Sequence, residues 1–171
     1  MKIKLGVFFG GKSVEHEVSI ITALQAIENM NKEKYDIVPI YIAKDNKMYC
    51  GDFVDDIKQY TNIDNLKRIS TQVTLSLKDN KTVLLRTNKK FYENEVYDYS
   101  DVAFPIVHGT NVEDGTLQGY LKMFNLPYVG CDVTSSAVGM DKYVSKTILK
   151  ENNIPVLDCK CYYKNEEVED I

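Results

Sequence analysis

The chain has 171 residues, of which 44% are hydrophobic and 27% are charged, with 9 glycines and 4 prolines. This composition is typical of a globular protein and excludes collagen-like and disordered classes. The net charge is -4, and the basic residues are interleaved with acidic ones, which argues against a nucleic-acid partner. No apolar run approaches the roughly 20 residues of a membrane span. The N-terminus also lacks a secretory cleavage site, so we expect a cytoplasmic protein with no membrane partner.

Cysteine and histidine contents restrict the chemistry. His16 and His108 are too few for a multi-histidine metal site, whereas a magnesium site built from carboxylates would need neither. The four cysteines follow no zinc-ligand spacing, and cytosolic thiols stay reduced. We therefore interpret all four as structural: Cys50, Cys131, Cys159 and Cys161.

The first three predicted elements form a βαβ unit. Residues 3–9 are a short apolar run ended by Gly10 and Gly11, which predicts a buried parallel strand opening into a loop. Residues 36–42 predict a second strand. Between them, apolar residues at every third position predict one face of a helix: Val18, Ile21, Leu24, Ile27 and Met30. The crossover of such a unit is right-handed in nearly all cases.

Residues 44–100 differ from the flanking sequence in being polar and rich in tyrosine and asparagine. Two alternating segments, 72–77 and 81–85, are joined by the turn-like residues 78–80. This pattern predicts a β-hairpin that elaborates an otherwise parallel sheet.

The strand–helix pattern resumes at residues 102–107, an apolar strand that ends at His108. A helix follows Gly115, and we interpret its apolar face as core: Leu117, Tyr120, Leu121 and Phe124. Residues 128–130 predict a brief strand, 135–150 a further helix, and 156–163 one last strand. The fold class is therefore α/β, an open parallel sheet with a hairpin insertion.

In such a sheet, ligands bind beyond the carboxyl ends of the strands. A polar loop after the first predicted strand, residues 10–19, has neither the P-loop nor the GxGxxG spacing. Its carboxylates, Glu15 and Glu17, suit a cationic group such as an ammonium. Alternatively they only complement the dipole of the following helix.

Two further clusters are candidates. His108 follows a buried strand, where it either orients a substrate carboxylate, transfers a proton, or only fixes the loop. Glu113 and Asp114 precede a helix, where capping is the favoured role. Lys142 and Lys146 share one helix face and either bind phosphate or are simply solvated.

Three motifs in order, GGKSVEHEVS at 10–19, HGTNVEDGTLQG at 108–119 and VGCDVTSSAVGMDKYVSK at 129–146, resemble the N-terminal part of D-alanine–D-alanine ligases. The resemblance implies that residues 1–130 form the Rossmann-like N-terminal domain that precedes an ATP-grasp domain, with residues 44–100 as an insertion. Residues 131–171 would be the first helix and strand of that central ATP-grasp domain.

The resemblance also implies an activity in peptidoglycan synthesis. ATP phosphorylates the carboxylate of one D-alanine, and the amine of a second attacks the acyl phosphate to form the dipeptide. By motif, Glu15 corresponds to the catalytic glutamate that holds the first substrate's ammonium, and Val18 to its neighbour in that pocket. His108 corresponds to the catalytic histidine beside the first D-alanine, and Lys142 to the lysine that reaches the ATP phosphates.

Several expectations about cofactors and partners follow from this resemblance. The full-length ligase would use ATP with magnesium or manganese, and would pair as a homodimer through this domain. The magnesium-binding acids lie downstream of these motifs in the family, so we expect no metal site, no tightly bound cofactor and no turnover from this chain alone.

Two alternatives stay open. The second substrate could be D-serine or D-lactate in place of D-alanine. The chain could instead be a non-catalytic α/β module for dimerisation or binding. A crevice shared by Glu15 and His108 would separate a substrate site from such a scaffold.

Overall fold

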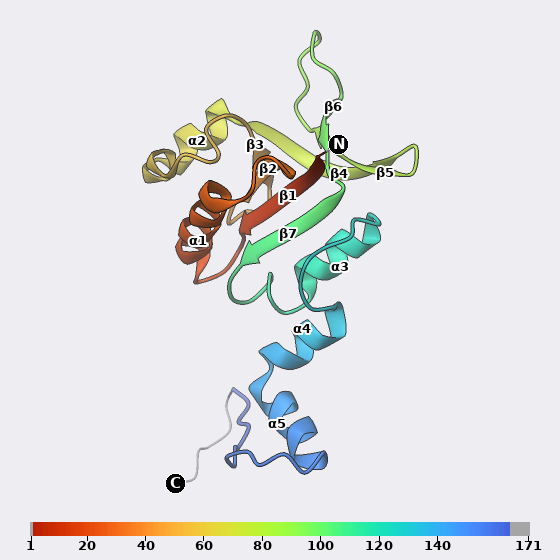
Figure 1. The fold of residues 1–171 in the computed structure, drawn as a ribbon. Helices are drawn as coiled ribbons and strands as arrows, with labels where there is room; N and C mark the ends of the chain where they lie inside the picture. Colours follow the sequence, from red (N-terminus) through yellow and green to blue (C-terminus); the bar gives the residue numbers. More distant parts are fainter. Residues whose placement is uncertain (1, 165–171) are drawn as a thin grey trace.

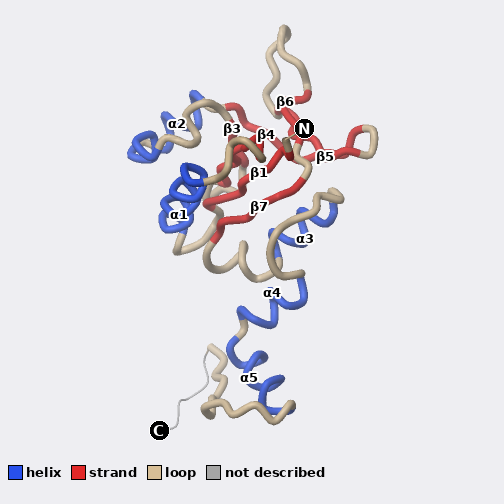
Figure 2. The backbone as a smooth tube through the Cα atoms, in the orientation of Figure 1, coloured by secondary structure: helices blue, strands red, loops and turns tan. Residues whose placement is uncertain are grey.

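A computed structural model describes residues 2–164 of the chain. The centre of the fold is a seven-stranded sheet in the order β6-β5-β4-β3-β2-β1-β7 (Figures 1 and 2). The strands are β1 (Ile3–Gly10), β2 (Tyr35–Ile42), β3 (Met48–Cys50), β4 (Thr71–Lys78), β5 (Lys81–Arg86), β6 (Val96–Tyr99) and β7 (Val102–Val107). The helices are α1 (His16–Asn29), the 3-10 helix η1 (Ile57–Thr61), α2 (Ile63–Ile69), α3 (Thr116–Met123), α4 (Val133–Met140) and α5 (Lys142–Glu151).

The parallel part of the sheet consists of β1 between β2 and β7. Gly10 at the end of β1 is level with Ile42 of β2 and Val107 of β7, so the three carboxyl ends lie at one edge. Helix α1 covers one face of these strands and α3 covers the other (Figure 1). Because both faces are covered, the strands carry the nearly continuous apolar runs expected of buried parallel strands. The predicted βαβ unit is confirmed.

The insertion at residues 44–100 extends the same sheet with antiparallel strands. The predicted hairpin is β4 and β5, and its turn residues Asp79 and Asn80 both have positive φ, at 51° and 59°. Aspartate and asparagine tolerate this left-handed backbone better than other side-chain-bearing residues. The sheet is therefore mixed, with the parallel order confined to β1, β2 and β7.

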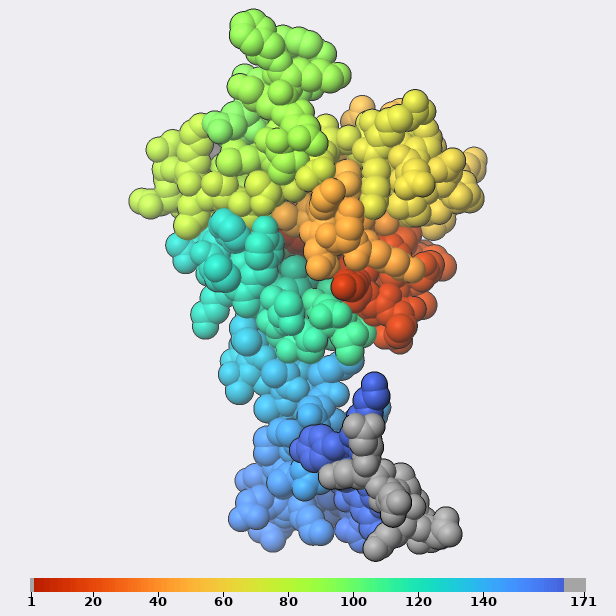
Figure 3. All heavy atoms as spheres, turned by 180° about the vertical axis from the view of Figure 1, so that it is seen from behind, coloured from red at the N-terminus to blue at the C-terminus, as the bar shows by residue number. Residues whose placement is uncertain are grey.

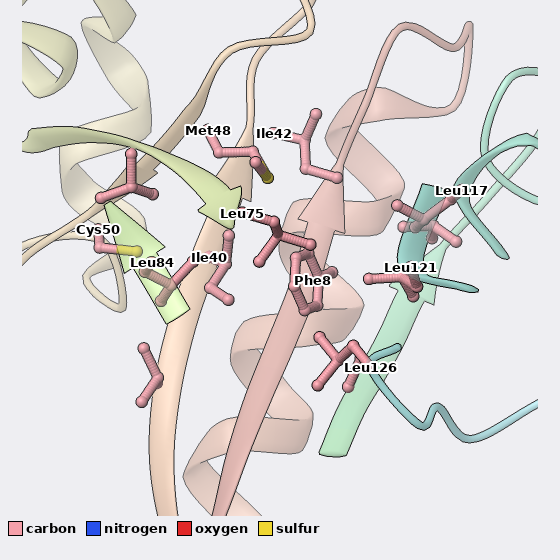
Figure 4. Packing of buried hydrophobic residues seen from close by; sticks show 14 of the residues in the cluster. Phe8, Ile40, Ile42, Met48, Cys50, Leu75, Leu84, Leu117, Leu121 and Leu126 are labelled. Atoms are coloured by element: carbon pink, nitrogen blue, oxygen red, sulfur yellow. The ribbon is translucent and has the colours of Figure 1, made fainter. Parts of the chain in front are cut away.

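The insertion shares its core with the parallel strands. Leu84 of β5 and Leu75 of β4 lie in one buried cluster with Phe8 of β1 and Leu121 of α3 (Figure 4). A second cluster on the opposite face packs α1 against the sheet. Cys50 is buried in the first cluster, where desolvation raises the pKa of its thiol. Only Cys50 fits the structural role predicted for all four cysteines, because Cys131, Cys159 and Cys161 are exposed free thiols.

Helix α1 buries a different face from the one predicted. Val18 and Ile21 are each 49% exposed, whereas Leu24 and Ile27 are buried as expected. A strict three-residue repeat drifts around a helix that has 3.6 residues per turn, so it cannot stay on one face. The buried face instead alternates steps of three and four residues: His16, Ser19, Ile20, Ala23, Leu24 and Ile27.

The C-terminal elements also differ from the prediction. The expected helix 135–150 is two helices, because Asp141 between them has an extended backbone and its Oδ1 accepts from the amides of Tyr143 and Val144. Asp141 thus ends α4 and caps α5. The expected strand 128–130 is a single parallel bridge between Tyr128 and Ala103.

The strand predicted for 156–163 is wrong, because the structure shows no regular element there. A strand needs a neighbouring strand to pair with, and none lies beside this segment in the described part of the chain. Helices α4 and α5 project away from the sheet (Figures 1 and 3). Residues 165–171 of the predicted second domain lie outside the described residues, and the division at residue 130 remains a prediction. None of the helices within residues 2–164 is long and apolar enough to cross a membrane.

Candidate functional site

The candidate site lies where the chain turns to opposite faces of the sheet. The chain leaves β1 for α1 on one face, and leaves β7 for α3 on the other (Figure 1). In open α/β sheets, ligands bind outside the carboxyl ends of the strands at such a switch point. Here the loops are residues 11–15 after β1 and residues 108–115 after β7.

Direct contacts join these two loops. The side-chain amide of Asn111 donates to the carbonyl of Lys12 at 2.9 Å. Gly11 lies against Val112, so close that any β-carbon at position 11 would collide with the valine side chain. The motifs at 10–19 and 108–119, which are about a hundred residues apart in sequence, therefore form one structure.

Gly109 brings Glu15 next to His108. Its φ of 86° is in the left-handed region that favours glycine. A β-carbon at Gly109 would also lie only 2.9 Å from Oε2 of Glu15 and would overlap the hydroxyl of Ser13. The carboxylate of Glu15 thus lies against the residue that immediately follows His108. The loops that carry two of the predicted site residues, Glu15 and His108, therefore meet at this edge of the sheet.

The two glutamates of the first loop have different environments. Glu15 is the N-cap residue of α1, but its side chain makes no capping hydrogen bond and forms no ion pair with any described residue. Glu17 accepts from Nζ of Lys44 at 2.7 Å, and this hydrogen bond lowers the pKa of Glu17. The carboxylate of Glu15 is therefore the one that remains available for a cationic ligand.

His108 lies between α1 and the loop after β7. Its Nε2 is 3.1 Å from the hydroxyl of Thr22, and its Nδ1 is 4.0 Å from Oε1 of Glu113. Its side chain is 34% exposed, so it is open to a ligand. The carboxylate of Glu113 also accepts from the amide of Gly109, which holds it beside the imidazole. Glu113 thus acts within this loop and does not cap the helix.

Asp114 has the capping role that the sequence suggested. It accepts from the amide of Asn111 at 2.7 Å and from that of Thr116 at 3.1 Å. Desolvation by burial opposes ionisation of Asp114, but the hydrogen bonds from Thr116 and Asn111 outweigh it and lower the pKa of the carboxyl group. These bonds fix the start of α3 and the shape of the loop that carries His108.

A buried polar network under the first loop escaped sequence reasoning. The hydroxyl of Ser19 accepts from the amide of Gly10 at 2.7 Å and donates to the carbonyl of Ile106 at 2.6 Å. His16 is 2.6 Å from the carbonyl of Gly11 and 3.0 Å from the hydroxyl of Tyr41. Burial lowers the pKa of His16, although the hydrogen bond to Gly11 opposes the shift. The sequence did contain a signal for this network: His16 and Ser19 lie at helical spacing from the apolar residues Ile20 and Ala23, which places all four on one face of α1.

Of the remaining predicted residues, Val18 lies near Glu15, whereas Lys142 lies far from the two loops. Val18 is exposed on α1, three residues after Glu15, a spacing that places both on one side of a helix. Lys142 is exposed at the start of α5, which packs on α4 and lies away from the ends of β1 and β7 (Figure 1). Among residues 2–164, no group of three or more His, Cys, Asp or Glu side chains is placed to hold a metal ion.

This architecture defines the class: an α/β domain in which the loops after two parallel strands meet at the carboxyl edge of the sheet. Residues 4–131 match the family model described as D-ala D-ala ligase N-terminus. The chain belongs to this family, so the resemblance carried by the three motifs is confirmed.

Named relatives agree with this assignment. A D-alanine--D-alanine ligase of Thermosipho melanesiensis is 41% identical over 157 residues, covering 91% of this chain and 42% of the relative. The chain thus spans less than half the length of this relative.

Solved structures give the same fold. The D-alanine-D-alanine ligase of Coxiella burnetii is 36% identical with a TM-score of 0.78, over 92% of this chain and 43% of that one. VanG D-Ala:D-Ser ligase of Enterococcus faecalis is 31% identical with a TM-score of 0.71, over 91% and 43%. A Bacillus anthracis D-alanine--D-alanine ligase complexed with ATP is 29% identical with a TM-score of 0.60, over 98% and 42%.

Proposed function

We propose that this chain supplies the site for the first D-alanine in an ATP-dependent D-alanine–D-alanine ligase. One observation carries the proposal: the free carboxylate of Glu15 lies against Gly109, directly beside His108. A D-alanine zwitterion carries an ammonium and a carboxylate on neighbouring carbons. Glu15 would bind the ammonium, while His108 would orient the carboxylate, with Val18 closing the pocket beside Glu15.

The contribution of this site to the reaction is positioning. Holding the carboxylate of the first D-alanine in place prepares it for phosphorylation by ATP, and the amine of a second D-alanine then attacks the acyl phosphate. Fixed orientation of this kind supplies a large part of the rate enhancement in such reactions. The product dipeptide serves peptidoglycan synthesis.

ATP and magnesium or manganese belong to the same proposal. The family and the ATP complex of a relative at 29% identity support ATP as a substrate. Lys142 is the residue of this chain that we assign to the ATP phosphates. No described cluster of ligands fits a divalent ion, so we place metal binding in the part of the ligase that this chain does not span. We also propose a cytoplasmic enzyme that pairs as a homodimer through this domain.

A second candidate is a D-alanine–D-serine or D-alanine–D-lactate ligase. The similarity to VanG D-Ala:D-Ser ligase, at 31% identity, supports D-serine as an alternative second substrate. All three activities share the first D-alanine, so Glu15 and His108 would have the same roles. A non-catalytic module is less well supported, because a pure scaffold gives no reason for an unpaired carboxylate against Gly109, the residue that follows His108.

The test uses the 171-residue chain and a full-length ligase that contains it. Nitrogen-15 NMR of the chain should show D-alanine perturbing the amides of the loops 11–15 and 108–115. Glu15→Gln should weaken binding by about 10- to 100-fold, the range for a charge-assisted hydrogen bond. Glu17→Gln is the matched control, because Glu17 is paired with Lys44 and should leave binding unchanged.

In the full-length ligase, ADP release should require D-alanine as first substrate and should fall in Glu15→Gln by a similar factor. Comparing D-alanine, D-serine and D-lactate as second substrate separates the subtypes. Equal loss of binding in Glu15→Gln and Glu17→Gln, or no response to D-alanine at all, would overturn the proposal.

A further inference from the structure

The imidazole of His108 is held from one side by helix α1. The hydroxyl oxygen of Thr22 lies 3.1 Å from Nε2 of His108, within hydrogen-bond range. Nδ1 faces Glu113 at 4.0 Å, which is too far for a hydrogen bond. One ring nitrogen is therefore engaged by the protein, and the other makes no hydrogen bond to a described residue.

Neighbours of the Thr22 hydroxyl determine the direction of this hydrogen bond. The oxygen also lies 3.0 Å from the carbonyl oxygen of Val18 and 3.2 Å from that of Ser19. Carbonyl oxygens only accept, and the Thr22 hydroxyl donates its one hydrogen to these carbonyls of its own helix. Its lone pair then accepts from Nε2–H of His108. In the neutral ring, Nδ1 consequently has the free lone pair.

Thr22 is on a helix that is fixed to the sheet. Ser19, one turn earlier, uses its buried hydroxyl to join α1 to Gly10 of β1 and Ile106 of β7. His108 directly follows the last residue of β7. Helix α1 and the imidazole are therefore both attached to the same part of the sheet, β1 and β7. The Thr22 contact can therefore hold the ring at a defined angle.

We propose that Thr22 is a positioning residue that accepts a hydrogen bond from Nε2–H of His108 and so directs Nδ1 toward the ligand. This inference rests on the proposed function in one respect, namely that the ligand facing Nδ1 is the carboxylate of the first D-alanine. A hydrogen bond from Nδ1 to that carboxylate requires the imidazolium, in which both ring nitrogens carry a hydrogen and Nε2–H still donates to Thr22.

The test compares Thr22→Val with Thr22→Ser in the 171-residue chain. Valine has nearly the shape and helix propensity of threonine but no hydroxyl, whereas serine keeps the hydroxyl. Only two histidines are present, so nitrogen-15 NMR resolves both rings. We expect His108 to be the Nε2–H tautomer in the wild type and in Thr22→Ser, and a mixture of tautomers in Thr22→Val. Unchanged His16 signals would show that Thr22→Val is folded.

D-Alanine affinity gives a second readout. We expect about a fivefold loss in Thr22→Val, the scale of one hydrogen bond, and recovery in Thr22→Ser. A wild type with the Nδ1–H tautomer, or a Thr22→Val chain with unchanged tautomer and affinity, would overturn the inference. If even the wild type fails to bind D-alanine, the proposed function fails, and the tautomer measurement still decides the role of Thr22.

Discussion

The seven-stranded sheet and the helices α4 and α5 differ in how their apolar side chains are covered. In the sheet, Phe8 and Ile40 have no exposed surface and are packed between the strands and α3 (Figure 4). In α5, no residue is buried, and Tyr143, Ile148 and Leu149 are exposed. The sheet with α1 to α3 thus encloses its own core, whereas the apolar side chains of α5 remain partly exposed within residues 2–164.

This contrast separates two kinds of helix stability. Helix α1 is held by burial against the sheet, the usual source of helix stability in proteins. Among the described residues, α5 is supported by the Asp141 cap, by its contact with α4 and by an exposed ion pair between Lys150 and Asp158. An isolated helix of this length is marginal in water. We therefore expect the two regions to unfold separately, and the site formed by Glu15 and His108 to depend on the sheet alone.

The largest effect should come from removing a buried aromatic side chain. Phe8→Ala should destabilise the sheet by about 4 kcal/mol, because it leaves a cavity in the core. Ile148→Ala in α5 should change the free energy of unfolding by less than about 0.5 kcal/mol. Urea unfolding followed by circular dichroism measures both, and the chain has no tryptophan to report it by fluorescence. Comparable losses in the two variants would contradict the division into a self-contained sheet and a dependent helix pair.

The same contrast explains which elements the sequence could predict. The strands β1, β2 and β7 and the hairpin β4–β5 lie within a residue or two of their predicted bounds, because their partners are present and burial imposes the apolar pattern. The strand expected at 156–163 has no partner strand, and local apolar residues alone do not make one. The break at Asp141 depends on a cap that competes with helix continuation, which a periodicity count misses.

For the site, the loops were predictable but their contacts were not. Glycine turns after two apolar strands located Glu15 and His108, since parallel strands bring such loops to one edge. The close approach at Gly109 depends on the positive φ of that residue. The difference between Glu15 and Glu17 depends on Lys44, a residue outside both loops that pairs with Glu17. The contact of Thr22 with His108 could not be predicted, because the predicted core face of α1 wrongly included Val18 and Ile21.

A smaller effect is expected from buried hydroxyl groups. Ser19→Ala should cost about 2 kcal/mol, because it leaves the amide of Gly10 and the carbonyl of Ile106 without a partner in a buried position. Ser145→Ala, which removes a hydrogen bond from α5 to the carbonyl of Val138 in α4, should cost less than about 1 kcal/mol, because that site is only partly buried. Chemical unfolding of the two variants compares them directly, and a larger loss in Ser145→Ala would reverse the comparison.

The smallest effect concerns pH and is confined to the sheet region, since both histidines precede α4. Burial lowers the pKa of His16 in the folded chain below its ordinary value of 6.5, although the hydrogen bond to Gly11 opposes this. Between these two pKa values the unfolded chain binds more protons, so this contribution to stability is present above pH 6.5 and is lost as the pH falls toward the folded pKa. The slope cannot exceed about 1.4 kcal/mol per pH unit for one proton.

His16→Gln removes the titrating group, so the stability difference between wild type and variant should shrink from pH 8 to pH 5. A difference that stays constant over this range would show that the fold does not hold His16 neutral. The side chain of His16 would then be less buried under the loop that carries Glu15 than its contacts with Gly11 and Tyr41 indicate.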